Sequence, residues 1–226
     1  MATVEQEIAP LVQGDKLTRE EFLRRWEAMP QVRKAELIGG IVYMPSPQTA
    51  DHGDMDVDVG YWLRTYTRKT PGCQPSHNAT TFMLEDAPQP DLHLRILPEY
   101  GGNTRMHHRF VTGAPELVSE VSLSSTSYDL HQKLELYQEA GVVEYIAILL
   151  REQEIRWHRL RGSAYQLLPQ STEGIICSKV FPGLWLDVQA MLRRDLEQVL
   201  ATLQQGLDSP AHAKFVTQLA RKRSAR

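Results

Sequence analysis

Cysteine is scarce in this chain, with only Cys73 and Cys177 among 226 residues. The two form no CxxC pair and no spacing typical of metal ligands. A disulfide-stapled scaffold and a cysteine-ligated zinc site are therefore excluded. Because disulfides are rare in the cytosol, we expect two reduced thiols, in the core or in loops, of a cytoplasmic protein.

Long hydrophobic runs are also absent. No apolar stretch approaches the roughly 20 residues that a membrane span needs. The segment from Met1 to Gln13 lacks the basic start and the apolar run of a signal peptide. We therefore expect a soluble, cytoplasmic protein without a membrane partner. The chain contains no internal repeat and no low-complexity tract.

The chain has no excess of basic residues: 25 Lys and Arg stand against 28 Asp and Glu, for a formal net charge of −3. A dedicated nucleic-acid binder is usually more basic, so this balance argues against a passive DNA coat protein. It argues less against a nuclease, because a bound metal neutralises an acidic active site. The hydrophobic content of 42 % excludes a disordered chain and suffices for a core.

Helical signals occur in five places. Thr18 and Glu21 form a capping box at the start of the first helix, and Gly141 stands at the position that ends the third. Apolar residues at helical spacing mark the others. The predicted helices span residues 18–26, 54–68, 129–140, 191–207 and 215–226.

Strand signals alternate with these helices. A hairpin is predicted over 35–44, because Gly39-Gly40 tolerates the positive φ of a tight turn. Further strands are expected at 80–84, 92–96, 117–121, 142–150, 154–160 and 165–168, with a loop at 101–109. The strand, helix and strand between Glu120 and Leu150 predict a right-handed crossover in a mixed sheet. The fold class is therefore α/β.

Two carboxylates stand out in this pattern. Glu120 interrupts the apolar strand 117–121, where a buried charge is costly unless it meets a cation, a metal or a donor. The alternative is a strand-end glutamate that faces solvent. Asp91 follows Pro90 at the start of the preceding strand, and its alternative is a turn or cap aspartate.

Lys133 is the third candidate. It lies three residues after Leu130 and four before Tyr137, hence on the apolar stripe of its helix. The alternative is a lysine that covers apolar surface and reaches water. Together, the two acids could hold Mg²⁺ or Mn²⁺, which lowers the pKa of a bound water, and the lysine could position that water. Such a set can hydrolyse a phosphodiester.

An ordered series of segments resembles the Uma family, a group described as restriction endonucleases within the PD-(D/E)XK nuclease superfamily. The resemblance covers roughly Leu17 to Val188. The matching segments are Glu36-Leu37-Ile38-Gly39-Gly40, Gln89-Pro90-Asp91, Glu120-Val121, Ser125-Thr126, Asp129, Lys133, Tyr137, Gly141-Val142, Glu144-Tyr145 and Phe181-Pro182-Gly183-Leu184.

The resemblance implies a restriction-endonuclease-like core with flanking helices. It implies that Asp91 and Glu120 are metal ligands and that the carbonyl of Val121 is a third. The superfamily's lysine normally follows the acid by two places, where this chain has Ser122; the resemblance assigns that role to Lys133 instead. The family's Ser-Pro-Ser-Thr after the acid reads 123–126 Leu-Ser-Ser-Thr here.

Glu36 and His52 also match recurring family positions, which places them among the catalytic candidates in the same cleft. For each, a structural role as a hairpin glutamate or a helix-start histidine stays open. The adjacent His107 and His108 are either part of a surface loop or of a loop that contacts phosphate. The basic end of the chain, 221–226, is either a solvated tail or a contact to nucleic acid.

The predicted organisation is an amino-terminal arm at 1–16, a nuclease domain at 17–188 and a helical extension with a basic tail at 189–226. The predicted function is a Mg²⁺-dependent DNA endonuclease that cleaves phosphodiester bonds with metal-activated water. The resemblance further implies pairing into a homodimer, since restriction-type enzymes often pair to cut both strands. The alternative is a nuclease-fold module that binds nucleic acid or protein with little or no catalysis.

Overall fold

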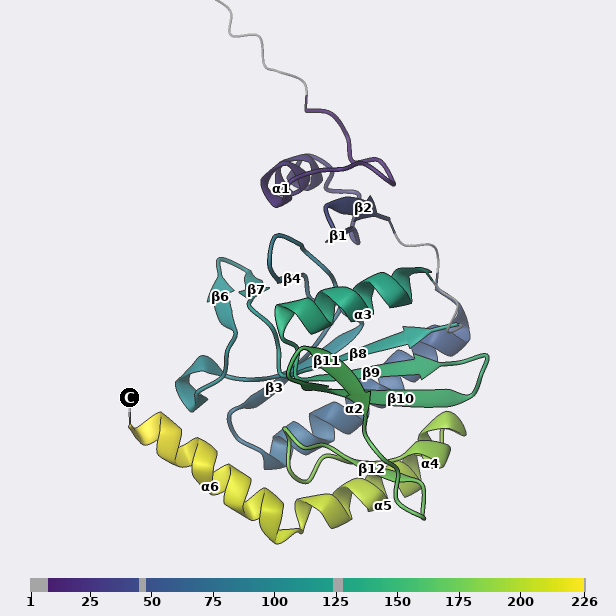
Figure 1. Ribbon diagram of the computed structural model, residues 1–226, viewed down its shortest axis with the longest axis vertical. Helices are drawn as coiled ribbons and strands as arrows, with labels where there is room; N and C mark the ends of the chain where they lie inside the picture. The colour runs from purple at the N-terminus through teal and green to yellow at the C-terminus, as the bar shows by residue number, and fades with distance from the viewer. Residues whose placement is uncertain (1–7, 45–47, 124–127, 226) are drawn as a thin grey trace, which may run out of the picture.

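A six-stranded mixed sheet forms the centre of the computed structural model, which describes residues 8–44, 48–123 and 128–225 (Figure 1). Its strand order is β11-β10-β9-β8-β5-β3. Only β8 and β9 run parallel, and the other neighbours are antiparallel. The strands are β3 (Cys73–His77), β5 (Leu92–Ile96), β8 (Leu117–Ser122), β9 (Glu144–Leu149), β10 (Glu154–Arg161) and β11 (Ala164–Leu167). The predicted mixed α/β fold is confirmed.

The parallel pair is joined by helix α3 (Tyr128–Ala140). Strand β9 is buried along its whole length, as expected for a central strand covered on both faces. Gly141 ends the helix with φ +84°, a left-handed conformation that glycine adopts without steric cost. The strand, helix and strand predicted around Glu120 to Leu150 are therefore present, and β8 leads from the sheet straight into α3.

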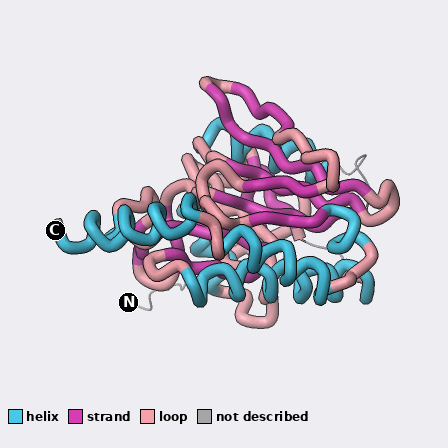
Figure 2. The backbone as a smooth tube through the Cα atoms, turned by 90° about the horizontal axis from the view of Figure 1, so that it is seen from below, coloured by secondary structure: helices cyan, strands magenta, loops and turns pink. Residues whose placement is uncertain are grey.

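The two faces of the sheet have separate hydrophobic cores. Helix α3 covers one face through Leu136 and Tyr137. The other face packs against α2 (Ala50–Lys69), α4 (Val188–Leu192) and α5 (Leu196–Leu207), and Figure 2 shows these helices along one side of the sheet. Trp62 of α2 meets Trp157 of β10 edge to face, with ring centroids 5.9 Å apart. The carboxyl-terminal helices thus share the main core.

A smaller unit from the first part of the chain covers the α3 side (Figure 1). It contains α1 (Arg19–Glu27) and the hairpin of β1 (Glu36–Ile38) and β2 (Ile41–Tyr43). The Thr18 side chain accepts a hydrogen bond from the Glu21 N–H, so the predicted cap is confirmed. A backbone bridge between Leu37 and Ala87 ties the hairpin to the segment that precedes β5. This bridge brings Glu36 to the Gln89 N–H, two residues before Asp91.

Some segments of the Uma-like series have structural roles. The buried Glu144 carboxylate accepts hydrogen bonds from Ser178 Oγ at 2.7 Å and from Trp157 Nε1 at 3.1 Å. The Lys179 N–H donates to the same carboxylate at 2.7 Å. These bonds anchor the loop that places the fully buried Phe181 in the core. Burial with several donors is a satisfied arrangement for a carboxylate.

Several predicted elements were wrong. The segment 101–109 is not one loop: after the 3₁₀ turn η1 (Pro98–Tyr100) it enters the hairpin of β6 (Arg105–His107) and β7 (Phe110–Thr112). The strand at 80–84 shrinks to β4 (Thr81–Phe82), which pairs with β7. Strand β3 was missed because it is polar and contains Pro75, which is compatible with its place at the sheet edge.

The carboxyl-terminal part differs as well. The helix predicted over 191–207 is broken between α4 and α5, where Arg194 has φ +61° and Asp195 caps α5. The short pair β12 (Ile175–Cys177) and β13 (Trp185–Asp187) was not predicted. Helix α6 (Pro210–Ser224) begins earlier than 215, because Ser209 caps it and Pro210 occupies its first turn.

Two of the absences noted in the sequence recur in the structure. Both cysteines are free thiols, Cys73 buried and Cys177 half-buried. Among the described helices, none has the length and apolarity required to cross a bilayer.

Because α5 is part of the main core, Leu203→Ala is expected to destabilise the whole protein by about 2–5 kcal/mol. Leu203 is fully buried. Urea unfolding followed by circular dichroism should show one transition at a lower midpoint. Gln205→Ala, at an exposed position of the same helix, is the control and should stay within about 0.5 kcal/mol of the wild type. A separate early transition, with the main one unchanged, would show that α5 is an independent appendage.

Candidate functional site

Asp91 and Glu120 come together where β5 begins beside β8. The register pairs Leu92 with Ser119, so the next position along brings Asp91 opposite Glu120. The Val121 N–H donates to Asp91 Oδ2 at 3.0 Å. In an extended strand the N–H and C=O of one residue point to the same side, so the Val121 carbonyl also faces the Asp91 edge. Both acids are buried, at 3 % and 4 % exposure, which excludes a solvent-facing Glu120.

Lys133 lies between two carboxylates. Its Nζ is 3.0 Å from Glu36 Oε1 and 3.2 Å from Glu120 Oε1. The side chain is almost fully buried, so it does not reach water past an apolar surface. One helical turn later, the Tyr137 hydroxyl donates to Glu120 Oε1 at 2.5 Å. The structure thus brings Glu36, Glu120 and Lys133 of the predicted set into direct contact.

The ionisation of this cluster follows from its charges. Burial raises the pKa of Glu120 to about 8; Lys133 opposes this, while Asp91 and Glu36 add to it. Burial lowers the pKa of Lys133, but the negative charges of Glu120, Glu36 and Asp91 outweigh this effect and hold it above its ordinary value. Two carboxylates therefore contact the Lys133 ammonium group, and the charge of Asp91 acts on both Glu120 and Lys133. The excess of negative charge favours a further cation at this place.

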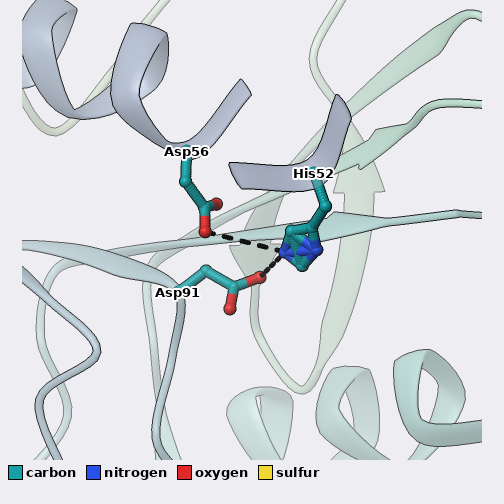
Figure 3. A group of neighbouring side chains, drawn as sticks. All are labelled: His52, Asp56 and Asp91. Atoms are coloured by element: carbon teal, nitrogen blue, oxygen red, sulfur yellow. Dashed lines mark ion pairs between the residues drawn. The ribbon is translucent and has the colours of Figure 1, made fainter. Parts of the chain in front are cut away.

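A second group of donors includes Asp91 together with two side chains of helix α2 (Figure 3). His52 lies in the first turns of α2. Its Nε2 atom is 3.3 Å from Asp91 Oδ2 and 3.6 Å from Asp56 Oδ2. One ligand atom from each of these three residues fits within 4.8 Å of the others. Glu120 is not a member of this group, so Asp91 is the acid at which the two clusters meet.

Lys34 and Asn78 border this second group. Lys34 Nζ is 3.4 Å from Asp91 Oδ1 and donates to Asn78 Oδ1 at 2.9 Å. Burial raises the pKa of Asp56 to about 7; the charge of Asp91 adds to this and Lys34 opposes it. Burial also lowers the pKa of His52, against the pull of Asp91. A neutral imidazole beside buried carboxylates is a donor set that suits a divalent cation.

The remaining candidates lie elsewhere. His107 and His108 are exposed at the turn between β6 and β7, with ring centroids 4.5 Å apart. In the basic tail, Arg223 Nη1 donates to the Tyr100 hydroxyl at 3.0 Å. No contact described for the structure joins either group to Asp91 or Glu120. The Ser125-Thr126 segment lies outside the described residues.

Sequence reasoning missed Asp56 and Lys34. The signal for Asp56 was present, because it follows His52 by four residues and therefore shares its helix face. It also stands next to Met55, on the stripe that packs against the sheet. The predicted helix began only at residue 54, so His52 and Asp56 were not placed on one helix. Nothing in the local sequence marks Lys34, whose position depends on the packing of the amino-terminal unit.

The buried Asp56 should make the metal-free protein less stable at higher pH. Its folded-state pKa of about 7 exceeds the ordinary 3.8. The stability that the folded protein gains by holding a proton on Asp56 is therefore fully present below about pH 4. It is lost as the pH rises to about 7. In EDTA, Asp56→Asn should lose less unfolding free energy than the wild type between about pH 5 and pH 8. Urea titrations at the two pH values measure this difference.

Asp51→Asn is the matched control, because Asp51 is an exposed acid on the same helix. It should keep the wild-type pH dependence. An Asp56→Asn protein with the wild-type pH dependence would contradict the burial argument.

Comparisons with known proteins agree with this architecture. The crystal structure of "a putative nuclease belonging to DUF820 from Anabaena variabilis ATCC 29413" superposes with a TM-score of 0.60 at 16 % identity, covering 78 % of this chain and 99 % of that one. At this identity, the likeness shows the fold alone. A comparison with curated protein sequences gave no match. Residues 19–189 match the family model Uma2, described as "Putative restriction endonuclease". The chain belongs to the Uma2 family and has the fold of a restriction-endonuclease-like protein.

Proposed function

We propose that the protein is a metal-dependent DNA endonuclease. The observation that carries this proposal is the buried Lys133 ammonium, which lies between Glu120 and Glu36. A buried amine next to clustered carboxylates, in a family described as restriction endonucleases, matches the apparatus needed for phosphodiester hydrolysis.

Asp91 and Glu120 would hold the metal ion, with the Val121 carbonyl as a third oxygen ligand. The fit rests on hard oxygen donors, on the excess of carboxylates over ammonium groups and on the Val121 N–H that fixes Asp91. When bound, Mg²⁺ or Mn²⁺ would lower the pKa of a water molecule and stabilise negative charge on phosphate oxygens. The buried acids need such a cation to remain ionised together.

Lys133 would act on the nucleophile or on the charge that develops at phosphorus. Its ammonium group has three donors, and Glu36 and Glu120 orient it. A donor held in place before the reaction stabilises the transition state without reorganisation. Tyr137 would keep Glu120 in position through its hydroxyl. Glu36, also fixed by the Gln89 N–H at 2.6 Å, would act as the anchor for the lysine.

The first test is plasmid nicking in Mg²⁺ or Mn²⁺. Asp91→Asn and Glu120→Gln should each lower the rate by about 100-fold or more, because the metal supplies several kcal/mol of charge stabilisation. Lys133→Met should lower it by about 100- to 1,000-fold, as for other preorganised donors.

Two exposed positions supply matched controls. Glu135→Gln on α3 and Lys214→Met on α6 should keep wild-type nicking. If the Asp91 and Glu120 variants nick as well as the controls do, the assigned site is wrong.

A second candidate is a nuclease-fold module that binds nucleic acid or protein without efficient chemistry. It is favoured by one observation: Lys133 and Tyr137 already bond the Glu120 carboxylate. For the endonuclease, calorimetric titration with Mn²⁺ should give saturable binding that Asp91→Asn weakens. Intact DNA binding without any saturable Mn²⁺ isotherm would instead support the module.

A further inference from the structure

We infer that His52, Asp56 and Asp91 form a second cation position, distinct from the one between Asp91 and Glu120, and that it takes a divalent first-row transition metal in preference to Mg²⁺. Its role in DNA cleavage rests on the proposed function. Binding of the cation does not, because it depends only on the three side chains.

The geometry comes from two segments that meet at the end of the sheet. His52 and Asp56 lie four residues apart on α2, so both project from one face of the helix toward the start of β5 (Figure 3). Thr49 caps this helix through the His52 N–H, which fixes the first turn. One ligand atom from each of His52, Asp56 and Asp91 lies within 4.8 Å of the other two. One ion can therefore contact all three.

The burial and the sparse hydrogen bonding of Asp56 are independent signs that its carboxylate can bind a cation. The side chain is 97 % removed from solvent, since its exposure is 3 %. Its Oδ1 atom has no hydrogen-bond partner among the described residues. The ion pairs described for Oδ2 are with the imidazoles of His52 and His77, both at 3.6 Å. A buried carboxylate this poorly satisfied is costly, and a bound cation would remove the cost.

Lys34 supplies this charge only in part. Its ammonium group is 3.4 Å from Asp91 Oδ1 and is held by Asn78 at 2.9 Å. The ion pairs found among the described residues include none between Lys34 and Asp56. The Lys34 ammonium group therefore neutralises part of the Asp91 charge, and a cation can still bind beside Asp56.

The donor types decide which metal is preferred. Mg²⁺ demands an octahedral shell of oxygens and keeps several waters. An imidazole nitrogen suits first-row transition ions, and their affinity for mixed nitrogen and oxygen sites rises from Mn²⁺ toward Cu²⁺. His77, whose side chain is 54 % exposed, has its Nε2 3.6 Å from Asp56 Oδ2 and adds a second imidazole nearby. The set therefore differs from the oxygen-only position between Asp91 and Glu120.

The experiment is calorimetric titration of the full chain with Co²⁺ and with Mg²⁺, followed by Co²⁺ absorption spectroscopy. His52→Gln and Asp56→Asn should each weaken one Co²⁺ binding event by at least about 10-fold. Glu120→Gln should keep that event, although it impairs nicking. His131→Gln, at an exposed position of α3, is the matched control and should bind Co²⁺ as the wild type does.

Wild-type Co²⁺ affinity in both His52→Gln and Asp56→Asn would overturn the inference, whatever happens to nicking. A wild type that never nicks DNA but still loses Co²⁺ binding in these two variants would reject the endonuclease and keep the cation position. If one variant does not fold, the other decides. Paramagnetic broadening of the His52 ring signal by Co²⁺ in the wild type gives a direct second readout, and an unbroadened ring would also overturn the inference.

Discussion

The contact on which the site depends is the buried ion pair of Lys133 with Glu120 and Glu36. Isolated, each of these charges would be costly inside the protein, and breaking one partner of such a group leaves an uncompensated buried charge. The ammonium group joins three parts of the fold, because Glu36 comes from the amino-terminal hairpin, Glu120 from β8 and Lys133 from the crossover helix α3. The chemistry and the packing of the amino-terminal unit are therefore coupled.

Asp91 connects this cluster to the second one. Its carboxylate is fixed by the Val121 N–H and lies beside His52. The same acid thus belongs to the imidazole-containing group and lies across the strand pair from Glu120. Burial, to which neighbouring carboxylates add, raises the pKa of Glu120 to about 8 and that of Asp56 to about 7, which favours protons on both acids near neutral pH. Binding a divalent cation and releasing those protons are two sides of one equilibrium.

Much of this arrangement could be predicted from the sequence, where local pattern and tertiary packing agree. The helix cap at Thr18, the apolar strand β9 and the crossover helix α3 follow from periodicity and end signals. Strand β3 could not be predicted, because its polar residues and Pro75 acquire strand structure only through pairing with β5. Lys34 was missed for a similar reason, because it reaches Asp91 through packing between segments far apart in the chain. Asp56 was missed because the predicted helix began at residue 54, so Asp56 was not placed on one helix face with His52.

Anomalous diffraction from crystals of the full chain soaked in Mn²⁺ would show whether Asp91 binds a cation. We expect a peak contacted by the Asp91 and Glu120 carboxylates, with Lys133 still bound to Glu36. We also expect a second peak among His52, Asp56 and Asp91. Well-ordered side chains with no anomalous peak on Asp91 would contradict a cation site at this acid and, with it, the proposed chemistry.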